Sequence, residues 1–192
     1  MYEIQDTREE ALRETVKTKE TVYRGKIFNV EVSQVTLPNG KITRRDVVRH
    51  RGAVCVLPLL DDGRVMLVRQ WRAGYGGVTL EIPAGKLDEG ETDPLAACKR
   101  ELREEIGAHA GKWTYLGEYY GSPAILDEKI HMYLAEELTF GETHPDFDEF
   151  LVPEIIPLSE LKDLCLDGKI PDGKTQAAAL RVFLMRSAMP KC

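Results

Sequence analysis

Three glutamates lie close together in a segment with the pattern of an amphipathic helix. Glu101 and Glu105 are four residues apart, so a helix that turns about 100° per residue places them within about 40° of each other. Glu104 falls about 60° to the other side of Glu101. Like charges at this spacing destabilise a helix, but a divalent cation removes the repulsion, and Mg²⁺ prefers carboxylate oxygens. The spacing therefore indicates a metal-binding stripe.

The alternative for this stripe is a solvated acidic face that nearby basic residues balance. Lys99, Arg100 and Arg103 are close enough in sequence to do so. Both interpretations need the same helix, and they differ only in what neutralises its carboxylates.

The helix that carries the glutamates has recognisable ends. Asp93 is expected to cap its N-terminus, with Pro94 in the first turn, where a missing N–H is tolerated. The helix is expected to run to about Ile106 and to stop at Gly107, because glycine suits the left-handed position after a helix end. Leu102 belongs to an apolar arc beside the glutamates that can face a core.

The rest of the chain predicts a mixed sheet with helices on both faces. Short apolar or strand-like segments are expected at residues 53–60, 65–71, 113–119 and 129–135. A further helix is expected from about Ser159, and a last one from about Lys174 to Met185.

The first fifty residues are expected to form a separate N-terminal β element (1–50), ahead of a main domain at residues 51–192. Residues 1–20 are polar and predict a short helix. From Thr21 to Val48 the pattern is strand-like, and Pro38-Asn39-Gly40 supplies a hairpin turn.

The composition is that of a globular chain without a basic surface. The chain has 192 residues, 43% of them hydrophobic and 30% charged, and its net charge is −6. This charge argues against a nucleic-acid binder, which needs a basic face. The four cysteines and four histidines are scattered, so no structural zinc site is expected. No signal peptide or membrane span is expected, and the protein is predicted to be cytoplasmic.

Two stretches around the helix resemble the Nudix box, which reads G-x5-E-x7-R-E-U-x-E-E-x-G-U, with U aliphatic. Residues 85–91 read G-K-L-D-E-G-E, and residues 100–107 read R-E-L-R-E-E-I-G. There are two departures: eight residues, not seven, separate Glu91 from Arg100, and the last aliphatic position is Ala108. The extra residue falls in the turn before the helix, so the metal stripe is expected to survive.

The resemblance to the Nudix family implies an α/β/α sandwich with a mixed sheet and a site for Mg²⁺, with Mn²⁺ as the alternative. Glu101 and Glu105 would be the principal ligands. Glu104 would be a third ligand or hold a water, and the carbonyl of Ala84 would complete the shell.

The chemistry that the resemblance implies is hydrolysis of a pyrophosphate bond. Cations would neutralise the pyrophosphate and stabilise charge on the attacked phosphorus and the leaving oxygen. A water deprotonated by a carboxylate or by the metal would be the nucleophile. Arg100 would orient a glutamate through a bidentate pair, with Glu91 the expected partner. The alternative for Arg100 is a surface salt bridge.

Further segments within residues 21–185 resemble the ADP-ribose pyrophosphatase branch of the family. They are residues 68–72 (V-R-Q-W-R), residues 80–85 (L-E-I-P-A-G), Ser122-Pro123 with Asp127-Glu128, and residues 172–175 (D-G-K-T). The branch implies that the substrate is ADP-ribose, cleaved to AMP and ribose 5-phosphate.

The same resemblance implies roles at the substrate. Arg72 would contact the diphosphate, and Glu81 would assist the metal site or the substrate; a surface arginine and a structural carboxylate are the alternatives. Ser122 would lie beside the terminal ribose unless it belongs to an ordinary turn. Asp127 or Glu128 would help to bind substrate.

The catalytic base of this branch usually comes from an acidic loop after the last core strands, here residues 141–149. Asp146 and Asp148 align best with the expected pair, although glutamates are more typical there. Glu149 is a further candidate for the base. The alternative for the whole run is a solvated acidic loop.

The branch also implies a homodimer, in which the N-terminal element is exchanged and closes the partner's adenine pocket. Phe28 falls near the position of an aromatic residue that stacks on adenine, with Tyr23 as the second choice. Arg49 would reach a phosphate. The alternative for Phe28 is a place in the core.

Three other functions fit the sequence less well. The substrate could be another nucleoside diphosphate sugar or a dinucleotide, because the box handles only the diphosphate. A Nudix fold can also bind ADP-ribose as a sensor, but such a module is expected to have lost a helix carboxylate, and Glu101, Glu104 and Glu105 are all present. Cleaning of oxidised nucleoside triphosphates is disfavoured by the N-terminal extension.

Overall fold

The structure is a computed structural model that describes residues 7–144 and 147–188. Its contacts divide the chain into two compact units. The N-terminal unit comprises the described chain up to His50 together with Ser122–Glu128. The main unit comprises Arg51–Gly121 and the described chain from Lys129 onward. A short segment from the middle of the sequence therefore belongs with the N-terminal strands.

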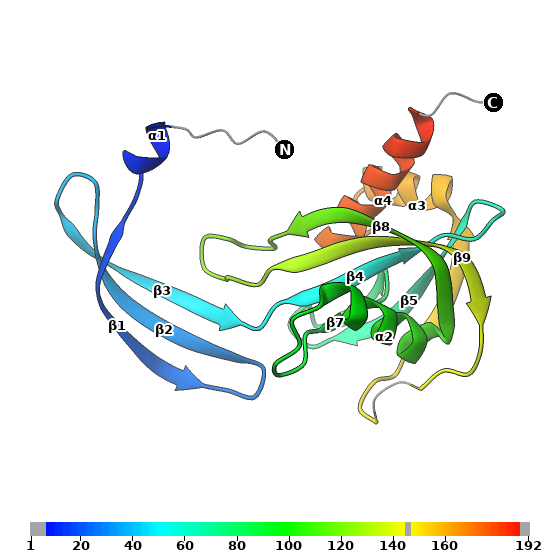
Figure 1. The fold of residues 1–192 in the computed structure, drawn as a ribbon, viewed down its shortest axis with the longest axis horizontal. Coiled ribbons are helices and arrows are strands. Elements are labelled where there is room, and N and C mark those ends of the chain that lie inside the picture. Colours follow the sequence, from blue (N-terminus) through cyan, green and yellow to red (C-terminus); the bar gives the residue numbers. More distant parts are fainter. Residues whose placement is uncertain (1–6, 145–146, 189–192) are drawn as a thin grey trace. The chain divides into compact units, whose positions relative to one another are not determined.

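The N-terminal unit holds an antiparallel sheet with the strand order β1-β2-β3 (Figure 1). Its elements are α1 (Thr7–Glu10), β1 (Thr15–Arg24), β2 (Phe28–Thr36) and β3 (Ile42–His50). The predicted turn at Pro38-Asn39-Gly40 is confirmed: Gly40 has φ 79° and donates to the carbonyl of Leu37 at 2.9 Å. The short helix predicted within residues 1–20 is confirmed at α1, but the strand begins at Thr15, earlier than the predicted Thr21, because residues from Thr15 onward, several of them β-branched, pair with β2.

The main unit contains two sheets and three helices among its described residues (Figure 1). The strands are β4 (Ala53–Pro58), β5 (Arg64–Arg72), β6 (Gly77–Glu81), β7 (Ala84–Lys86), β8 (Ala108–Tyr119), β9 (Ile130–Phe140) and β10 (Val152–Pro157). The helices are α2 (Pro94–Ile106), α3 (Leu158–Leu166) and α4 (Gly173–Ser187). One sheet has the order β7-β4-β9-β8, with β4 and β9 parallel; the other, β10-β5-β6, is antiparallel. No helix in the described ranges is long and apolar enough to cross a bilayer.

Alternate residues of β4 face opposite layers of the main unit. Cys55 and Leu57 pack in one core with residues of α3 and α4, whereas Val54 and Val56 pack in another with residues of α2. Successive side chains of a strand point to opposite faces, so α2 and the α3–α4 pair cover opposite faces of the four-stranded sheet (Figure 1). The predicted α/β/α sandwich with a mixed sheet is confirmed.

Helix α2 has the ends that the sequence predicts. The side chain of Asp93 accepts a hydrogen bond from the amide of Leu95 at 2.9 Å, and Gly107 follows the helix with φ 65°. The buried side of the helix includes Glu101 and Glu105. The extra residue in the preceding turn therefore stays outside the helix and does not move the two carboxylates out of line.

Gly107→Ala is expected to destabilise the main unit. A Cβ at this position would lie 2.6 Å from the carbonyl oxygen of Gly141, and the left-handed φ strains an alanine. We expect the free energy of unfolding, measured by urea denaturation, to fall by about 1–3 kcal/mol. Gly74→Ala is the matched control, because nothing lies within 4 Å of its Cβ position. Equal losses in the two variants would contradict the prediction.

Candidate functional site

Glu101 and Glu105 of α2 are buried against the backbone of β7, with exposed fractions of 7% and 3%. The amide of Ala84 donates to Oε2 of Glu105 at 3.3 Å. A Cβ on Gly85 would lie 1.9 Å from Oε1 of Glu101, so the Glu101 carboxylate occupies the space that a side chain at position 85 would fill. Steric exclusion by Glu101 thus explains why the first position of the Nudix-like box is a glycine.

Arg100 lies beside these carboxylates and contacts three glutamates. Its Nη1 donates to Glu101 at 2.8 Å and to Glu104 at 3.1 Å, and its Nη2 donates to Glu91 at 3.2 Å. Arg100 therefore reaches Glu91 despite the extra residue in the turn. The expected bidentate pair is wrong, however, because a single nitrogen makes the contact and the other charge-assisted hydrogen bonds go to the helix glutamates.

Burial raises the pKa of both helix carboxyls. The pKa of Glu101 rises to about 7 and that of Glu105 to about 9, and repulsion by Glu149 adds to each shift. Ionising both groups in this place costs free energy, which a nearby divalent cation would offset. Binding of a divalent cation would therefore favour loss of the protons from both carboxyls.

The donor atoms at this point suit a hard divalent cation. Glu101 and Glu105 offer carboxylate oxygens, and the peptide of Ala84 adjoins them. In their present positions, no three acidic, histidine or cysteine side chains of the described residues converge on one point, and Glu104 is engaged by Arg100. The two carboxylates are thus the ligands that this arrangement offers, and the carbonyl of Ala84 stays a prediction of the resemblance.

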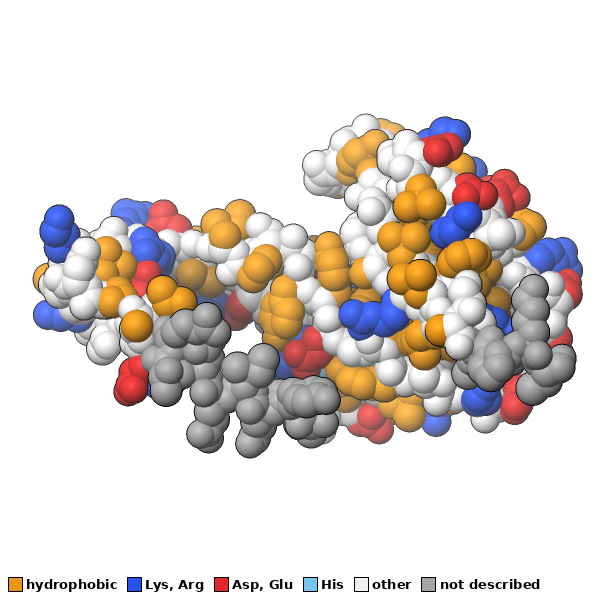
Figure 2. All heavy atoms as spheres, turned by 90° about the horizontal axis from the view of Figure 1, so that it is seen from above, with side chains coloured by type: hydrophobic (Ala, Val, Ile, Leu, Met, Phe, Trp, Pro, Cys, Tyr) orange, Lys and Arg blue, Asp and Glu red, His pale blue; other side chains and the backbone are white. Residues whose placement is uncertain are grey.

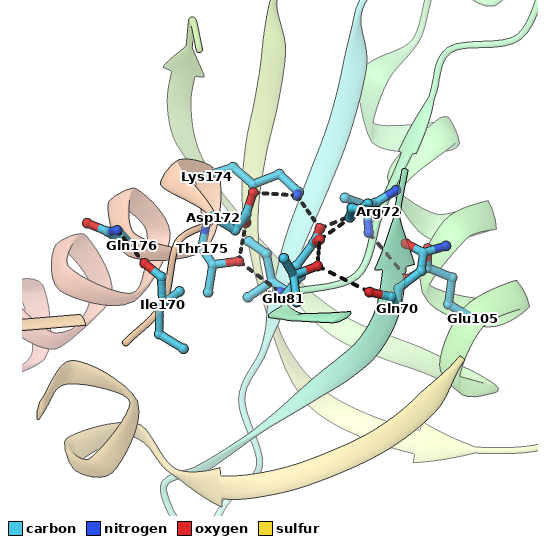
Figure 3. Close-up of polar contacts among 12 residues, drawn as sticks. Gln70, Arg72, Glu81, Glu105, Ile170, Asp172, Lys174, Thr175 and Gln176 are labelled. Atoms are coloured by element: carbon cyan, nitrogen blue, oxygen red, sulfur yellow. Dashed lines mark hydrogen bonds and ion pairs between the residues drawn. The ribbon is translucent and has the colours of Figure 1, made fainter. Parts of the chain in front are cut away.

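A second charged cluster surrounds Glu81 at the end of β6 (Figure 3). Arg72 donates to both oxygens of Glu81 at 2.8 Å, Lys174 donates to Oε2 at 2.5 Å, and the Thr79 hydroxyl donates to Oε1. Glu81 is 2% exposed. Burial acts to raise its pKa, but the hydrogen bonds from Arg72 and the charge of Lys174 outweigh burial and lower the pKa to about 2. The cluster therefore holds Glu81 ionised at neutral pH.

Arg72 connects this cluster to the helix carboxylates. Burial dominates the raised pKa of Glu105, and the charge of Arg72 acts on the same carboxyl in the opposite direction. The side chain of Arg72 is 39% exposed. Its hydrogen bonds with the described residues use Nε and Nη2, both with Glu81, which leaves the Nη1 edge of the guanidinium for a further ligand. This arrangement suits an anion bound between Arg72 and a cation on α2. The sequence assigns no role to Lys174, although the segment 172–175 that contains it is part of the resemblance to the ADP-ribose pyrophosphatase branch.

Glu149 of the acidic loop lies within electrostatic range of the helix carboxyls. This residue is half-buried, and its charge acts on both buried glutamates of α2. Asp148 is exposed, and Asp146 lies outside the described residues. The start of the loop is tied to the helix, since the amide of His144 donates to the carbonyl of Glu104 at 3.0 Å. Among the described candidates for the base, Glu149 is the one whose charge reaches the site.

Phe28 and Arg49, two of the expected substrate residues, belong to the N-terminal unit. Phe28 is 40% exposed and lies beside Tyr23, with ring centroids 5.7 Å apart, so it is not a core residue of this unit. Arg49 pairs with Glu31 and, at 3.1 Å, with Asp127. Its guanidinium is thus held between two carboxylates.

Ser122 and Glu128 belong to the same unit, at the two ends of its inserted segment. The carbonyl of Ser122 accepts a hydrogen bond from the amide of Leu126 at 2.9 Å, which places Ser122 in a turn. Oε1 of Glu128 is 3.2 Å from Nδ1 of His50. The expected residues thus fall into two groups. The carboxylates of α2 and Arg72 belong to the main unit, and the N-terminal unit holds Phe28, Arg49, Ser122 and Glu128.

The chain is similar to known proteins over most of its length. A NUDIX domain matches residues 49–179. An ADP-ribose pyrophosphatase of Bacillus subtilis (strain 168) is 38% identical, over 93% of this chain and 97% of its own. A methanol dehydrogenase activator of Bacillus methanolicus is 36% identical, over 92% and 96%. A crystal structure of an ADP compounds hydrolase superposes with a TM-score of 0.78 at 28% identity, over 94% of this chain and 97% of that chain.

Glu81→Gln is expected to weaken the main unit in a pH-dependent way. The pKa of Glu81 is about 2 in the folded protein against 4.5 for an ordinary glutamate. Its ionised form therefore stabilises the fold above about pH 4.5, and this contribution is lost as the pH falls toward about 2. Urea denaturation should show a loss of about 3 kcal/mol or more at neutral pH, shrinking between about pH 5 and pH 3.

Glu154→Gln serves as the control, because it removes one partner of a more exposed ion pair with Arg69 at 2.5 Å. Its expected cost is below about 1 kcal/mol. A Glu81→Gln deficit that grows in acid, or that equals the Glu154→Gln deficit, would contradict the assignment of Glu81 as a buried ionised group.

Proposed function

The chain belongs to the NUDIX family, and from this premise we propose that it hydrolyses the pyrophosphate bond of ADP-ribose, giving AMP and ribose 5-phosphate. The observation that carries the proposal is the pair of buried carboxylates, Glu101 and Glu105, within electrostatic range of Arg72. Such a site takes up a divalent cation on one side and offers a fixed guanidinium on the other, which together match a diphosphate.

The residues of the main unit divide the work of binding. Glu101, Glu105 and the carbonyl of Ala84 would hold the cation. When bound, the cation neutralises the diphosphate and stabilises charge on the leaving oxygen. Arg72 would bind the diphosphate with the guanidinium edge that Glu81 leaves free, so the anion is oriented before attack.

The attack itself needs a water and a base. Glu149 would take the proton from the attacking water, since its charge already acts on the buried glutamates. Arg100 would hold Glu104 in place, either as a further ligand or as the residue that orients a water. Asp146 and Asp148 are the alternative bases.

ADP-ribose is the substrate that we favour among nucleoside diphosphate derivatives. The relative from B. subtilis is an ADP-ribose pyrophosphatase, and the similar crystal structure is that of an ADP compounds hydrolase. The exposed ring of Phe28 suits stacking on adenine. Arg49, Ser122 and Glu128 would bind other parts of the substrate, although Arg49 must share its charge with two carboxylates.

The same proposal includes three further points: the bound ion is Mg²⁺, the protein is a homodimer, and its location is cytoplasmic. The dimer is supported by β1, which is exposed along nearly its whole length, so that side chains on both of its faces lack cover. Val16, Val22 and Tyr23 are more than half exposed there. Figure 2 shows apolar side chains among the surface atoms of the N-terminal unit, at the left of the view. A sheet of this kind is typical of an interface with a second copy.

Purified protein with Mg²⁺ and ADP-ribose is expected to release AMP and ribose 5-phosphate, which chromatography of the products would detect. Chelation of the metal by EDTA should abolish the reaction. Glu105→Gln removes a carboxylate from the ion site and is expected to lower kcat/KM by about 100-fold or more. Glu160→Gln, on the exposed side of α3, is the control and should keep full activity.

A panel of other substrates decides between the alternatives. Turnover of another nucleoside diphosphate sugar, a dinucleotide or a nucleoside triphosphate in place of ADP-ribose would overturn the substrate. Tight binding of ADP-ribose without cleavage of any compound would favour the sensor. Full activity in Glu105→Gln would move the metal site away from α2.

Glu149→Gln tests the base separately. Loss of a general base is expected to lower kcat by about 10²- to 10⁴-fold with little change in KM, because the substrate contacts remain. Asp148→Asn changes the neighbouring exposed carboxylate and should alter kcat by less than about 3-fold. The opposite order of effects would assign the base to Asp148.

A further inference from the structure

The segment 172–175 at the start of α4 joins the helix to the end of β6 in two ways. Asp172 caps the helix by accepting from the amide of Thr175 at 3.0 Å, and the Thr175 hydroxyl accepts from the amide of Ile82 at 3.0 Å. Lys174, between them, donates from Nζ to Asp172 at 2.8 Å and to Glu81 at 2.5 Å. One short segment therefore anchors both the backbone and the side chain at the end of β6.

The lysine in this segment is unusual because its side chain is only 11% exposed. Lysine is almost never fully buried unless it is paired. An apolar residue of similar length would fill the same space without the cost of removing an ammonium group from water. The Thr175 contact already ties α4 to the chain at the end of β6, so attachment of the helix alone does not explain why a charge is buried here.

The charge instead acts on the orientation of one carboxylate. Lys174 binds Oε2 of Glu81 and Thr79 binds Oε1. With each oxygen anchored, the carboxylate group cannot rotate freely about its bond to the side chain. Arg72 in turn uses Nε and Nη2 to grip both oxygens, so the plane of its guanidinium follows the plane of the carboxylate. Figure 3 shows Lys174 and Arg72 approaching Glu81 from two sides.

We infer that Lys174 is a positioning residue for Arg72. Lys174 acts through Glu81 and sets the direction of the free edge of the Arg72 guanidinium. The inference rests on the proposed function, in which that edge binds the diphosphate. A misdirected edge would weaken diphosphate binding and orientation even though Arg72 itself is intact. Lys174 therefore affects the reaction from behind the ion pair, without touching the substrate.

A double-mutant cycle with ADP-ribose and Mg²⁺ tests this route. Lys174→Met keeps the aliphatic stem and removes the charge, and it is expected to lower kcat/KM by about 10- to 100-fold. In an Arg72→Ala background the same change should cost less than about 3-fold, because there is no guanidinium left to position. Equal losses in the two backgrounds, or no loss in either, would overturn the inference.

A second readout does not depend on turnover. The Arg72 Nε–H signal in the ¹⁵N NMR spectrum, assigned by its absence in Arg72→Ala, should be protected from solvent exchange by its bond to Glu81. Protection is expected to persist in Lys169→Met, which removes a 63% exposed lysine paired with Asp167, and to be lost in Lys174→Met. An unchanged signal in Lys174→Met would overturn the inference whatever the substrate proves to be.

The outcomes separate this inference from the proposed function. If the wild type cleaves a different nucleoside diphosphate derivative, the substrate proposal fails and the same cycle is measured with that compound. If it cleaves none, the proposed function fails and the NMR signal alone decides. Circular dichroism shows whether Lys174→Met folds. If it does not, Thr79→Val removes the other anchor of Glu81 and is expected to lower kcat/KM in the wild-type background but not in Arg72→Ala. Equal losses in the two backgrounds would count against the inference.

Discussion

Two carboxyl groups, Glu101 and Glu105, are buried on one side of a single helix, where ionising both costs free energy, and the contacts around them lower that cost. Gly85 leaves room for one carboxylate, and the amide of Ala84 donates to the other. The half-buried side chain of Arg100 donates to Glu101 and Glu104 and supplies positive charge beside them. These contacts do not offset the whole cost of ionising both carboxyls, and a divalent cation is the species that the proposed reaction brings to offset the rest.

The Glu81 cluster has the opposite task, because it must hold the positively charged guanidinium of Arg72 in place and keep it from pairing with the nearby carboxylates of α2. Glu81 holds Arg72 by two hydrogen bonds and is held in turn from α4 by Lys174. The cluster is built at the end of β6, and the buried glutamates lie on α2. An antiparallel sheet, a helix pair and a loop–helix unit therefore meet at one site in the main unit.

In the proposed function, the two units have different roles. The main unit contains the carboxylates and the arginine that suit any diphosphate, and the NUDIX match covers nearly all of it up to residue 179. Phe28, Arg49, Ser122 and Glu128, the residues proposed to distinguish one nucleoside diphosphate from another, belong to the N-terminal unit. Relatives that match over more than nine-tenths of the chain have names as different as ADP-ribose pyrophosphatase and methanol dehydrogenase activator.

The sequence by itself determined the features that depend on neighbouring residues: the helix from Pro94 to Ile106, its capping by Asp93 and Gly107, and the alignment of Glu101 with Glu105. Helical geometry and cap chemistry act within a few residues, so spacing is enough to predict them. Tertiary structure alone decided that Thr15 begins a strand, that Glu149 of the acidic loop reaches the site, and that Lys174 pairs with a glutamate 93 positions earlier. These outcomes depend on which distant segments pack together. No local periodicity in the sequence predicts the partner of a buried charge or of a strand.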